Sequence, residues 1–357
     1  MRPLKGILLI LGLIVLLQPA PAPTKPSPPT TKTSKNKELE ERVRILEKQL
    51  MKKSANQKNR IALGEALFEL GNYDRVIEVL QPHMELLPRS ANLIIANAHR
   101  AQKKYLEEIR VYKHLVNMNT DDYLSHTELG RAYTDVNKPE EAILAYRKAI
   151  EIRPQHRPAY EALLKEYNRI GNHYESRLIV EDMIQYFGAK PDYLNELCRL
   201  YTVENYKDTA IDRCNLAVRK QPSNPDNHIY LGLNYKNSGD TAQATKILLN
   251  AAKRFPKSEH AQWVAGQVSE EAKNFLAAYT YYKQAIAADA ASARSHLGLA
   301  RSAFELKKYK ESLDSFSKAC PQNKEASEEF RKYAYRLRHL AEESWHEKFL
   351  GRASECN

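Results

Sequence analysis

The sequence predicts an all-α fold, an α-solenoid of about eight helix-turn-helix units followed by a C-terminal capping helix. Three observations support this prediction. Residues 122–154 have the pattern of two amphipathic helices, small residues recur along the chain with a fixed period, and prolines recur with the same period. Units that repeat at such a period stack on their neighbours instead of closing one globular core.

The segment 122–154 shows how two helices can pack as a pair. Small residues, Gly130 and Ala142, alternate with large ones, Tyr133 and Tyr146, at helical spacing. A bulky side chain on one helix can therefore face a gap on the other. Neither helix buries its apolar face alone.

The small residues and the closing prolines repeat with the same separation along the sequence. Gly232 and Gly266 are as many residues apart as Pro222 and Pro256. Gly130 lies three such periods before Gly232. A fixed period of this length, about 34 residues, indicates a helical repeat architecture.

These positions resemble the tetratricopeptide repeat family, with a small residue, Tyr, Gly-Asn or Gly-Asp, Ala, an aromatic residue, Ala and Pro once in each period. The resemblance covers residues 57–322 and implies a right-handed solenoid that binds other proteins. Two units depart from the pattern, one with Glu108 in place of Ala and one with Gly188 in place of Pro. Eight units begin near Gln57, Ala91, Tyr123, Arg157, Pro191, Pro225, Glu259 and Ala293.

Residues 1–22 have the pattern of a signal peptide or signal anchor. Arg2 and Lys5 precede an apolar run, residues 6–17. A helix of this run would span about 18 Å, less than the ~30 Å hydrocarbon core of a bilayer. Pro23 follows the small residues at which cleavage would occur. We therefore expect an exported protein of the bacterial periplasm, either soluble after cleavage or anchored in the inner membrane. A cytoplasmic protein with an apolar N-terminal helix is the alternative.

Two short segments precede the repeats. Residues 23–36 are rich in Pro and Thr, which predicts an extended linker. Residues 37–54 predict a short coiled-coil-like helix, in which Leu39 and Leu46 lie one heptad apart. This helix either packs on the first repeat or joins two copies in a homo-oligomer.

Residues 323–357 are expected to close the array as a capping helix and tail. Apolar residues recur at near-helical spacing from Lys324 to Leu350, which predicts one long helix. The last unit of a repeat array needs such a cover for its apolar face.

The four cysteines suggest one pairing. In the layout implied by the resemblance, Cys198 and Cys214 face each other across one helix pair. They form either a disulfide worth about 3 kcal/mol or two buried thiols. Cys320 and Cys356 are not expected to pair, because a helix of about 40 Å would separate them.

The resemblance also implies that the first helix of each unit lines a concave surface. Arg131, Lys165 and Arg199 should follow one another along it, with Arg169 beside them. Later units should add apolar side chains and a further cation at Ile229, Leu233, Trp263, Leu297, Phe304 and Arg301. Such a groove suits a protein segment with acidic and bulky residues. Alternatively, neighbouring glutamates pair with the cations and leave a surface of little affinity.

No sequence motif indicates catalysis, a metal or a cofactor. The net charge of +11 comes mostly from residues 1–60, with 13 Lys and Arg against 4 Asp and Glu. The remaining residues hold 42 against 40. The array therefore lacks the excess of cations that nucleic acid binding requires. We expect a non-catalytic scaffold for protein partners in the cell envelope. Two alternatives stay open, an accessory subunit of an envelope enzyme or assembly machine, and a spacer that oligomerises through residues 37–54.

Overall fold

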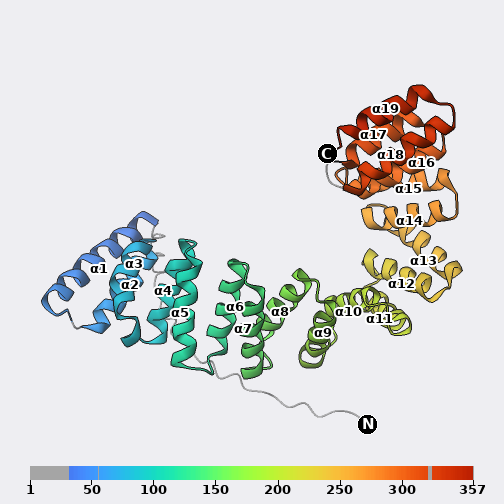
Figure 1. The fold of residues 1–357 in the computed structure, drawn as a ribbon. Coiled ribbons are helices and arrows are strands. Elements are labelled where there is room, and N and C mark those ends of the chain that lie inside the picture. Colours follow the sequence, from blue (N-terminus) through green and yellow to red (C-terminus); the bar gives the residue numbers. More distant parts are fainter. Residues whose placement is uncertain (1–31, 55, 321–323, 357) are drawn as a thin grey trace, which may run out of the picture. The chain divides into compact units, whose positions relative to one another are not determined.

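The computed structural model describes residues 32–54, 56–320 and 324–356. Within them lie nineteen α-helices, one 3-10 helix and no strand (Figure 1), which confirms the predicted all-α fold. The predicted signal segment, residues 1–22, lies outside the described ranges, as do residues 23–31. In those ranges, no helix has both the length and the apolar character needed to cross a bilayer.

The described residues divide into two compact units, the first ending at Gln102 and the second beginning at Lys103. The first unit holds a long helix, a hairpin with a 3-10 extension, and one further helix. Their bounds are α1 (Lys32–Lys52), α2 (Gln57–Glu69), α3 (Tyr73–Leu80), η1 (Gln81–Leu86) and α4 (Arg89–Ala101). Helix α1 begins at Lys32, inside the range 23–36 that was predicted to be a linker. The predicted linker was therefore too long at its C-terminal end.

Helix α1 packs against α2 of the same chain. Leu39 and Leu46, which formed the predicted heptad seam, are buried. An ion pair from Glu47 to Arg75 Nη2, 2.8 Å long, also joins α1 to α3. The apolar side of α1 is thus used within one chain, as the first of the two sequence interpretations expected.

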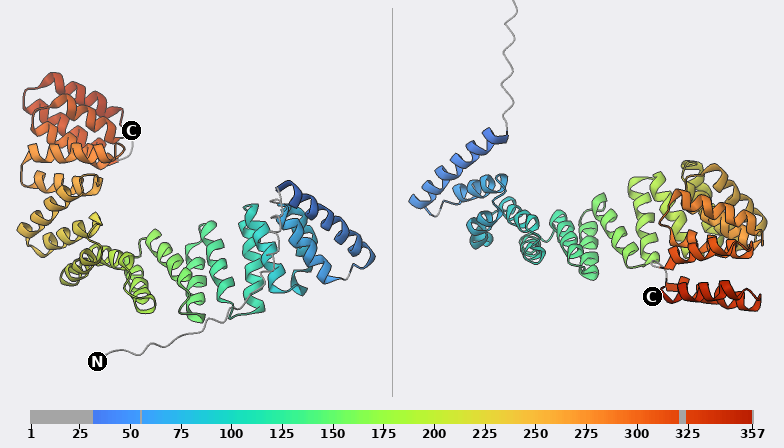
Figure 2. Two further views of the ribbon diagram at one scale, coloured as in Figure 1. Left: turned by 180° about the vertical axis from the view of Figure 1, so that it is seen from behind. Right: turned by 90° about the horizontal axis from the view of Figure 1, so that it is seen from above.

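The second unit begins with α5 (Tyr105–Met118) and continues as seven helical hairpins (Figures 1 and 2). In each hairpin, two helices of 11–16 residues are joined by a short turn. The hairpins are α6 (Tyr123–Asp135) with α7 (Pro139–Ile152), α8 (Arg157–Arg169) with α9 (His173–Phe187), α10 (Pro191–Val203) with α11 (Lys207–Lys220), α12 (Pro225–Ser238) with α13 (Thr241–Arg254), α14 (Glu259–Glu271) with α15 (Phe275–Ala288), α16 (Ala293–Glu305) with α17 (Tyr309–Ala319), and α18 (Lys324–His339) with α19 (Glu343–Ser354).

The small residues of the period lie where two helices approach most closely. A Cβ atom added to Gly130 would lie 2.6 Å from the ring of Tyr146. One added to Gly266 would lie 2.6 Å from the ring of Tyr282, which is fully buried. Interiors packed this tightly do not accept an extra carbon atom without displacement. The alternation of small and large residues in the sequence is therefore the packing code of the hairpins.

The turns inside the hairpins share one backbone feature. One residue of each turn has a positive φ and so lies in the left-handed region of backbone conformations. Residues other than Gly and Asn seldom occupy this region. From Lys103 onward these residues recur once in every period, at Lys103, Asn137, Gly171, Asn205, Gly239, Lys273, Lys307 and Ala341. The repeat period therefore continues to Ala341.

This last turn corrects the prediction of one long helix over residues 324–350. The chain reverses around Ala341, whose φ is +58°, so that α19 packs back on α18. His346 Nδ1 lies 2.8 Å from the carbonyl oxygen of Ala334 and links the two helices. The end of the chain is a further repeat hairpin, and Cys356 returns to Cys320. The two are bonded with Cα atoms 5.4 Å apart, so the expectation that they lie too far apart to pair was wrong.

A second disulfide lies inside the hairpin of α10 and α11. Cys198 and Cys214 are fully buried and bonded, with Cα atoms 4.6 Å apart. None of the four cysteines is free.

Candidate partner-binding site

The candidate site lies on the first helices of the hairpins in the second unit. These helices adjoin one another, α6 with α8, α10 with α12, α12 with α14, and α14 with α16. We call the exposed and half-buried side chains of these six helices the inner face. The predicted groove residues all come from them.

The predicted row of cations is not a free positive surface, which corrects the first of the two sequence interpretations and agrees with the second, in which glutamates pair with the cations. Arg131 forms an ion pair with Glu128. The guanidinium of Arg199 lies 2.6 Å from Glu196 Oε1. In both pairs the glutamate precedes the arginine by three residues, which places it on the same helix face. Of the three cations in this row, only Lys165 is exposed and forms no ion pair with a residue that the structure describes.

Two of these arginines also tie neighbouring hairpins together. Arg169 donates to Asn137 Oδ1 at 2.8 Å and to Glu166 Oε2 at 2.8 Å. Arg199 donates to Asn168 Oδ1 at 3.0 Å, and thereby connects α10 with α8. Their charges and donors are used within the array, which leaves little for an acidic partner.

The prediction that the groove has an exposed apolar end is also wrong. Ile229 is fully buried, and only 8 % of Leu297 and 3 % of Phe304 is exposed. Ile229 packs with Leu248 and Val264, in a core shared by α12, α13 and α14. These side chains point between successive hairpins, so they hold the array together and form no open surface.

The remaining predicted residues are only partly exposed. Leu233 and Trp263 pack on the edge of this core. The guanidinium of Arg294 lies 4.4 Å from the centre of a Trp263 ring. Arg301 lies 2.7 Å from Glu270 Oε1, so it too is an internal partner of a carboxylate. The ten predicted groove residues therefore do not form a common binding surface.

A polar pocket of about 240 Å³ opens on the inner face between α10 and α12. Sequence reasoning had singled out only one of its residues, Arg199. A hydrogen bond of 2.7 Å from Asn227 Nδ2 to Asn195 Oδ1 crosses from one helix to the other. The pocket is lined by Asp192, Asn195, Glu196, Arg199, Asn224, Asp226, Asn227 and Tyr230.

Two carboxylates of this pocket have lowered pKa values. Burial alone would raise the pKa of Glu196, but hydrogen bonds from Arg199 and Asn168 outweigh it and hold the pKa below its usual value. The hydrogen bond from His260, whose Nδ1 lies 2.8 Å from Asp226 Oδ1, lowers the pKa of Asp226. Both groups are therefore negatively charged at neutral pH.

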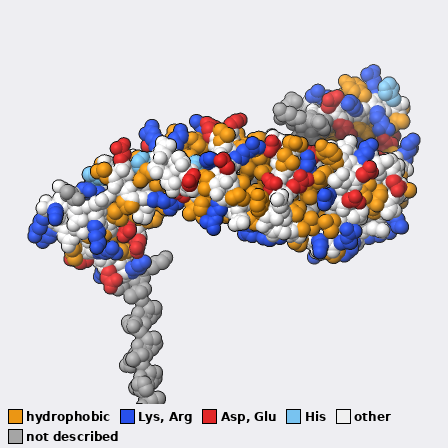
Figure 3. Space-filling view, turned by 90° about the horizontal axis from the view of Figure 1, so that it is seen from below, with side chains coloured by type: hydrophobic (Ala, Val, Ile, Leu, Met, Phe, Trp, Pro, Cys, Tyr) orange, Lys and Arg blue, Asp and Glu red, His pale blue; other side chains and the backbone are white. Residues whose placement is uncertain are grey.

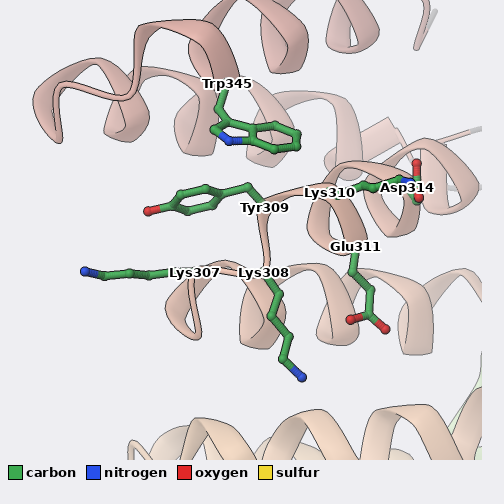
Figure 4. Close-up of a pocket in the computed structure, with 7 residues that line it drawn as sticks. All are labelled: Lys307, Lys308, Tyr309, Lys310, Glu311, Asp314 and Trp345. Atoms are coloured by element: carbon green, nitrogen blue, oxygen red, sulfur yellow. The ribbon is translucent and has the colours of Figure 1, made fainter.

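A larger pocket, of about 390 Å³, lies beside the turn between α16 and α17 (Figure 4). The Trp345 indole covers Tyr309, with ring centroids 5.9 Å apart. Lys307 and Lys308 point in different directions. Lys308 Nζ lies 3.8 Å from the ring centre of Tyr279, so this ammonium is already engaged. Because the charged groups do not converge, this pocket is the weaker candidate.

No extended patch of one charge stands out among the described residues in Figure 3. Lys and Arg side chains are interspersed with Asp and Glu on the face drawn there. Within the described ranges, no group of three or more His, Cys, Asp or Glu residues could hold a metal ion.

Comparisons with known proteins agree with a helical repeat architecture. Sequence models of the tetratricopeptide repeat match residues 124–156, 231–293 and 271–327. No curated protein matches the chain in sequence.

Solved structures with a similar arrangement of helices include three that share little sequence with this chain. The MamA protein is 19 % identical, over 49 % of this chain and 94 % of its own, with a TM-score of 0.42. YrrB, described as a TPR protein with an unusual peptide-binding site, is 17 % identical, over 52 % and 95 %, with a TM-score of 0.40. Yeast Tom70 is 12 % identical, over 90 % and 82 %, with a TM-score of 0.49.

The assignment to a family depends on the repeat models and on the packing of the chain itself. The fixed period, the glycines that meet tyrosine rings and the recurring left-handed turn all agree with the segments that the repeat models match. The chain carries tetratricopeptide repeats at residues 124–156 and 231–327, and its other described hairpins repeat with the same period.

Proposed function

We propose that this tetratricopeptide repeat protein is a non-catalytic scaffold that binds a segment of a partner protein on its inner face. The repeat family as a class supports a role in protein interaction. The observation that supports this particular surface is the polar pocket between α10 and α12.

The size of the pocket favours part of a larger partner over a free small molecule. At about 240 Å³ it falls below the ~300–1,000 Å³ that is usual for small-molecule sites. A single side chain of a longer segment would fill it, while the rest of that segment lies along the neighbouring first helices. Contact with several helices would supply the area that one pocket lacks.

We further propose that the protein works in the bacterial cell envelope. Two features support this location. Residues 1–22 have the pattern of an export signal. Both cysteine pairs are bonded, and disulfides persist chiefly in oxidising compartments outside the cytosol. Fractionation of native cells, with mass analysis of the N-terminus, tests the location and shows whether the signal is removed.

Site-specific photocrosslinking in native cells tests the binding surface. A photoreactive amino acid replaces Tyr230 in the pocket, and in a matched strain it replaces Lys246, which is exposed on the second helix of the same hairpin. We expect one protein to crosslink from position 230 and not from position 246. Equal capture from both positions, or no capture from position 230, would show that this surface is not the binding site.

A further inference from the structure

We propose that the pocket between α10 and α12 binds a positively charged side chain, a lysine ammonium or an arginine guanidinium, on the partner segment. This inference rests on the proposed function and adds the chemical class of the residue that is bound. It also reverses the polarity that the sequence suggested, because the acidic partner expected there would meet carboxylates.

The charges that line the pocket are mostly negative. Asp192, Glu196 and Asp226 face one cation, Arg199. That guanidinium donates to Glu196 and to Asn168, so it is already shared between two acceptors. Asp192 is exposed and forms no ion pair with any residue that the structure describes.

His260 borders the site and lies against one of its carboxylates, Asp226. Its Nδ1 lies 2.8 Å from Asp226 Oδ1, and half of the Asp226 side chain is still exposed. Arg294, the other cation near Asp226, pairs with Glu259. Asp226 therefore keeps an open side toward solvent, and a ligand can approach it there.

An independent observation points to a ligand that donates hydrogen bonds. Only 1 % of Asn227 is exposed, and its Oδ1 receives no hydrogen bond from any residue that the structure describes. Its amide orientation is set by two acceptors, Asn195 Oδ1 at 2.7 Å and the carbonyl oxygen of Gln221 at 3.5 Å, both of which face Nδ2. A buried acceptor without a donor is unusual and unfavourable.

A cationic side chain meets these requirements together. Lysine and arginine side chains carry donors and no acceptor, which suits carboxylates and the oxygen of Asn227. The half-buried ring of Tyr230 adds an aromatic face, which attracts cations. A carboxylate or phosphate would face three negative groups and only one engaged guanidinium.

The test uses small probes that differ in charge but little in shape. The dissociation constants of N-acetyl-arginine amide, N-acetyl-citrulline amide and N-acetyl-glutamate amide for the full chain are measured by ligand-observed NMR. Citrulline keeps the planar end of arginine without its charge. We expect the arginine probe to bind about tenfold more tightly than the citrulline probe, the difference that one charge-assisted hydrogen bond gives.

Variants locate that binding. Replacing two of the three pocket carboxylates, Asp192→Asn with Asp226→Asn, should weaken binding of the arginine probe about tenfold or more. The control is Asp212→Asn, which removes an exposed carboxylate of α11 and should leave binding unchanged. Circular dichroism checks that both proteins are folded.

Three results would overturn the proposal: equal binding of arginine and citrulline, tighter binding of glutamate, or equal losses in the pocket variant and the control. If crosslinking from position 230 still captures a partner, such results reject only the cationic side chain and leave the proposed function in place. Loss of that crosslink, with the arginine probe still bound, would reject the proposed function alone.

Discussion

Cys320 and Cys356 are bonded across the end of the array, although 36 residues separate them in the chain. The bond joins the end of α17 to the residues after α19, so it closes the last hairpin onto the one before it. A disulfide that closes a loop of this length lowers the entropy of the unfolded chain. This effect stabilises the folded protein by at most about 4 kcal/mol.

The first prediction concerns this closure. Replacing Cys356 by Ser should increase hydrogen exchange in α18 and α19 while α10 and α12 keep their protection, because repeats are stabilised mainly by their neighbours. Exchange followed by mass spectrometry measures both regions in one experiment. Unchanged protection of α19 would mean that packing alone holds the last hairpin.

The second prediction concerns the glycine that meets Tyr282. Gly266→Ala places a Cβ atom 2.6 Å from that buried ring and should lower the free energy of unfolding by about 1–3 kcal/mol. Gly351→Ala is the matched control, since a Cβ atom there meets no atom of the described residues within 4 Å. In that helix alanine should be neutral or stabilising by about 0.5–1 kcal/mol. Denaturant titration of both variants measures the contrast, and equal effects would contradict the packing code.

The third prediction concerns Arg177, which is 9 % exposed between two hairpins. Its Nε lies 2.6 Å from Glu204 Oε2, and its guanidinium lies 5.2 Å from the ring centre of Tyr201. Arg177→Met keeps much of the volume but leaves Glu204 without its partner in a largely buried place. We expect a loss of about 3–5 kcal/mol in the free energy of unfolding.

An exposed ion pair provides the control for that variant. Arg110 pairs with Glu107, and 74 % of its side chain is exposed. Arg110→Met should change the free energy of unfolding by no more than about 0.5 kcal/mol. If the two substitutions cost the same, burial is not the reason for the importance of Arg177.

The fourth prediction concerns pH. Burial raises the pKa of Glu259, but hydrogen bonds from Arg294, Ser292 and Ser295 outweigh it and lower the pKa to about 2. A lowered pKa stabilises the folded state above the pKa of the unfolded chain, about 4.5, and this stabilisation disappears as the pH falls toward 2.

Glu259→Gln should therefore destabilise the protein by about 1–2 kcal/mol at pH 7, a value reduced for solvent screening. The difference in the free energy of unfolding between this variant and the unchanged protein should shrink as the pH falls from 4.5 toward 2. Urea titrations at pH 7 and pH 3 measure it. A difference that is the same at both pH values would show that the charge of Glu259 does not contribute.

The sequence predicted the fold because its packing is encoded locally. Gly130 and Tyr146 belong to one segment, and their spacing alone indicates two helices in contact. The last hairpin was missed for an equally local reason. Ala341 occupies the left-handed turn, where Gly or Asn would have signalled a break, and alanine instead favours helix. Its position one full period after Lys307 was the signal that could have revealed it.

The candidate site was harder to predict, because the period gives a position in the repeat but not its exposure. Glu161 and Ile229 lie two periods apart, yet the first is exposed and the second is fully buried. Pairing of the cations was one of the two interpretations of the sequence, and the glutamates three residues before Arg131 and Arg199 were the signal that favoured it. The amide network of Asn195 and Asn227 depends on two helices that meet only in the folded chain.

The left-handed turns have a consequence for how the stability of this protein can change over evolutionary time. At Lys273, Lys307 and Ala341 a side chain occupies a conformation that glycine adopts without cost. Replacement by glycine would relieve strain at each turn by an amount of the order of 1 kcal/mol, partly offset by the greater freedom of the unfolded chain. Changes at independent sites usually add, so the effects of several such replacements should accumulate. The durability of the array can thus be adjusted in small steps, one hairpin at a time, while the surface that meets a partner stays the same.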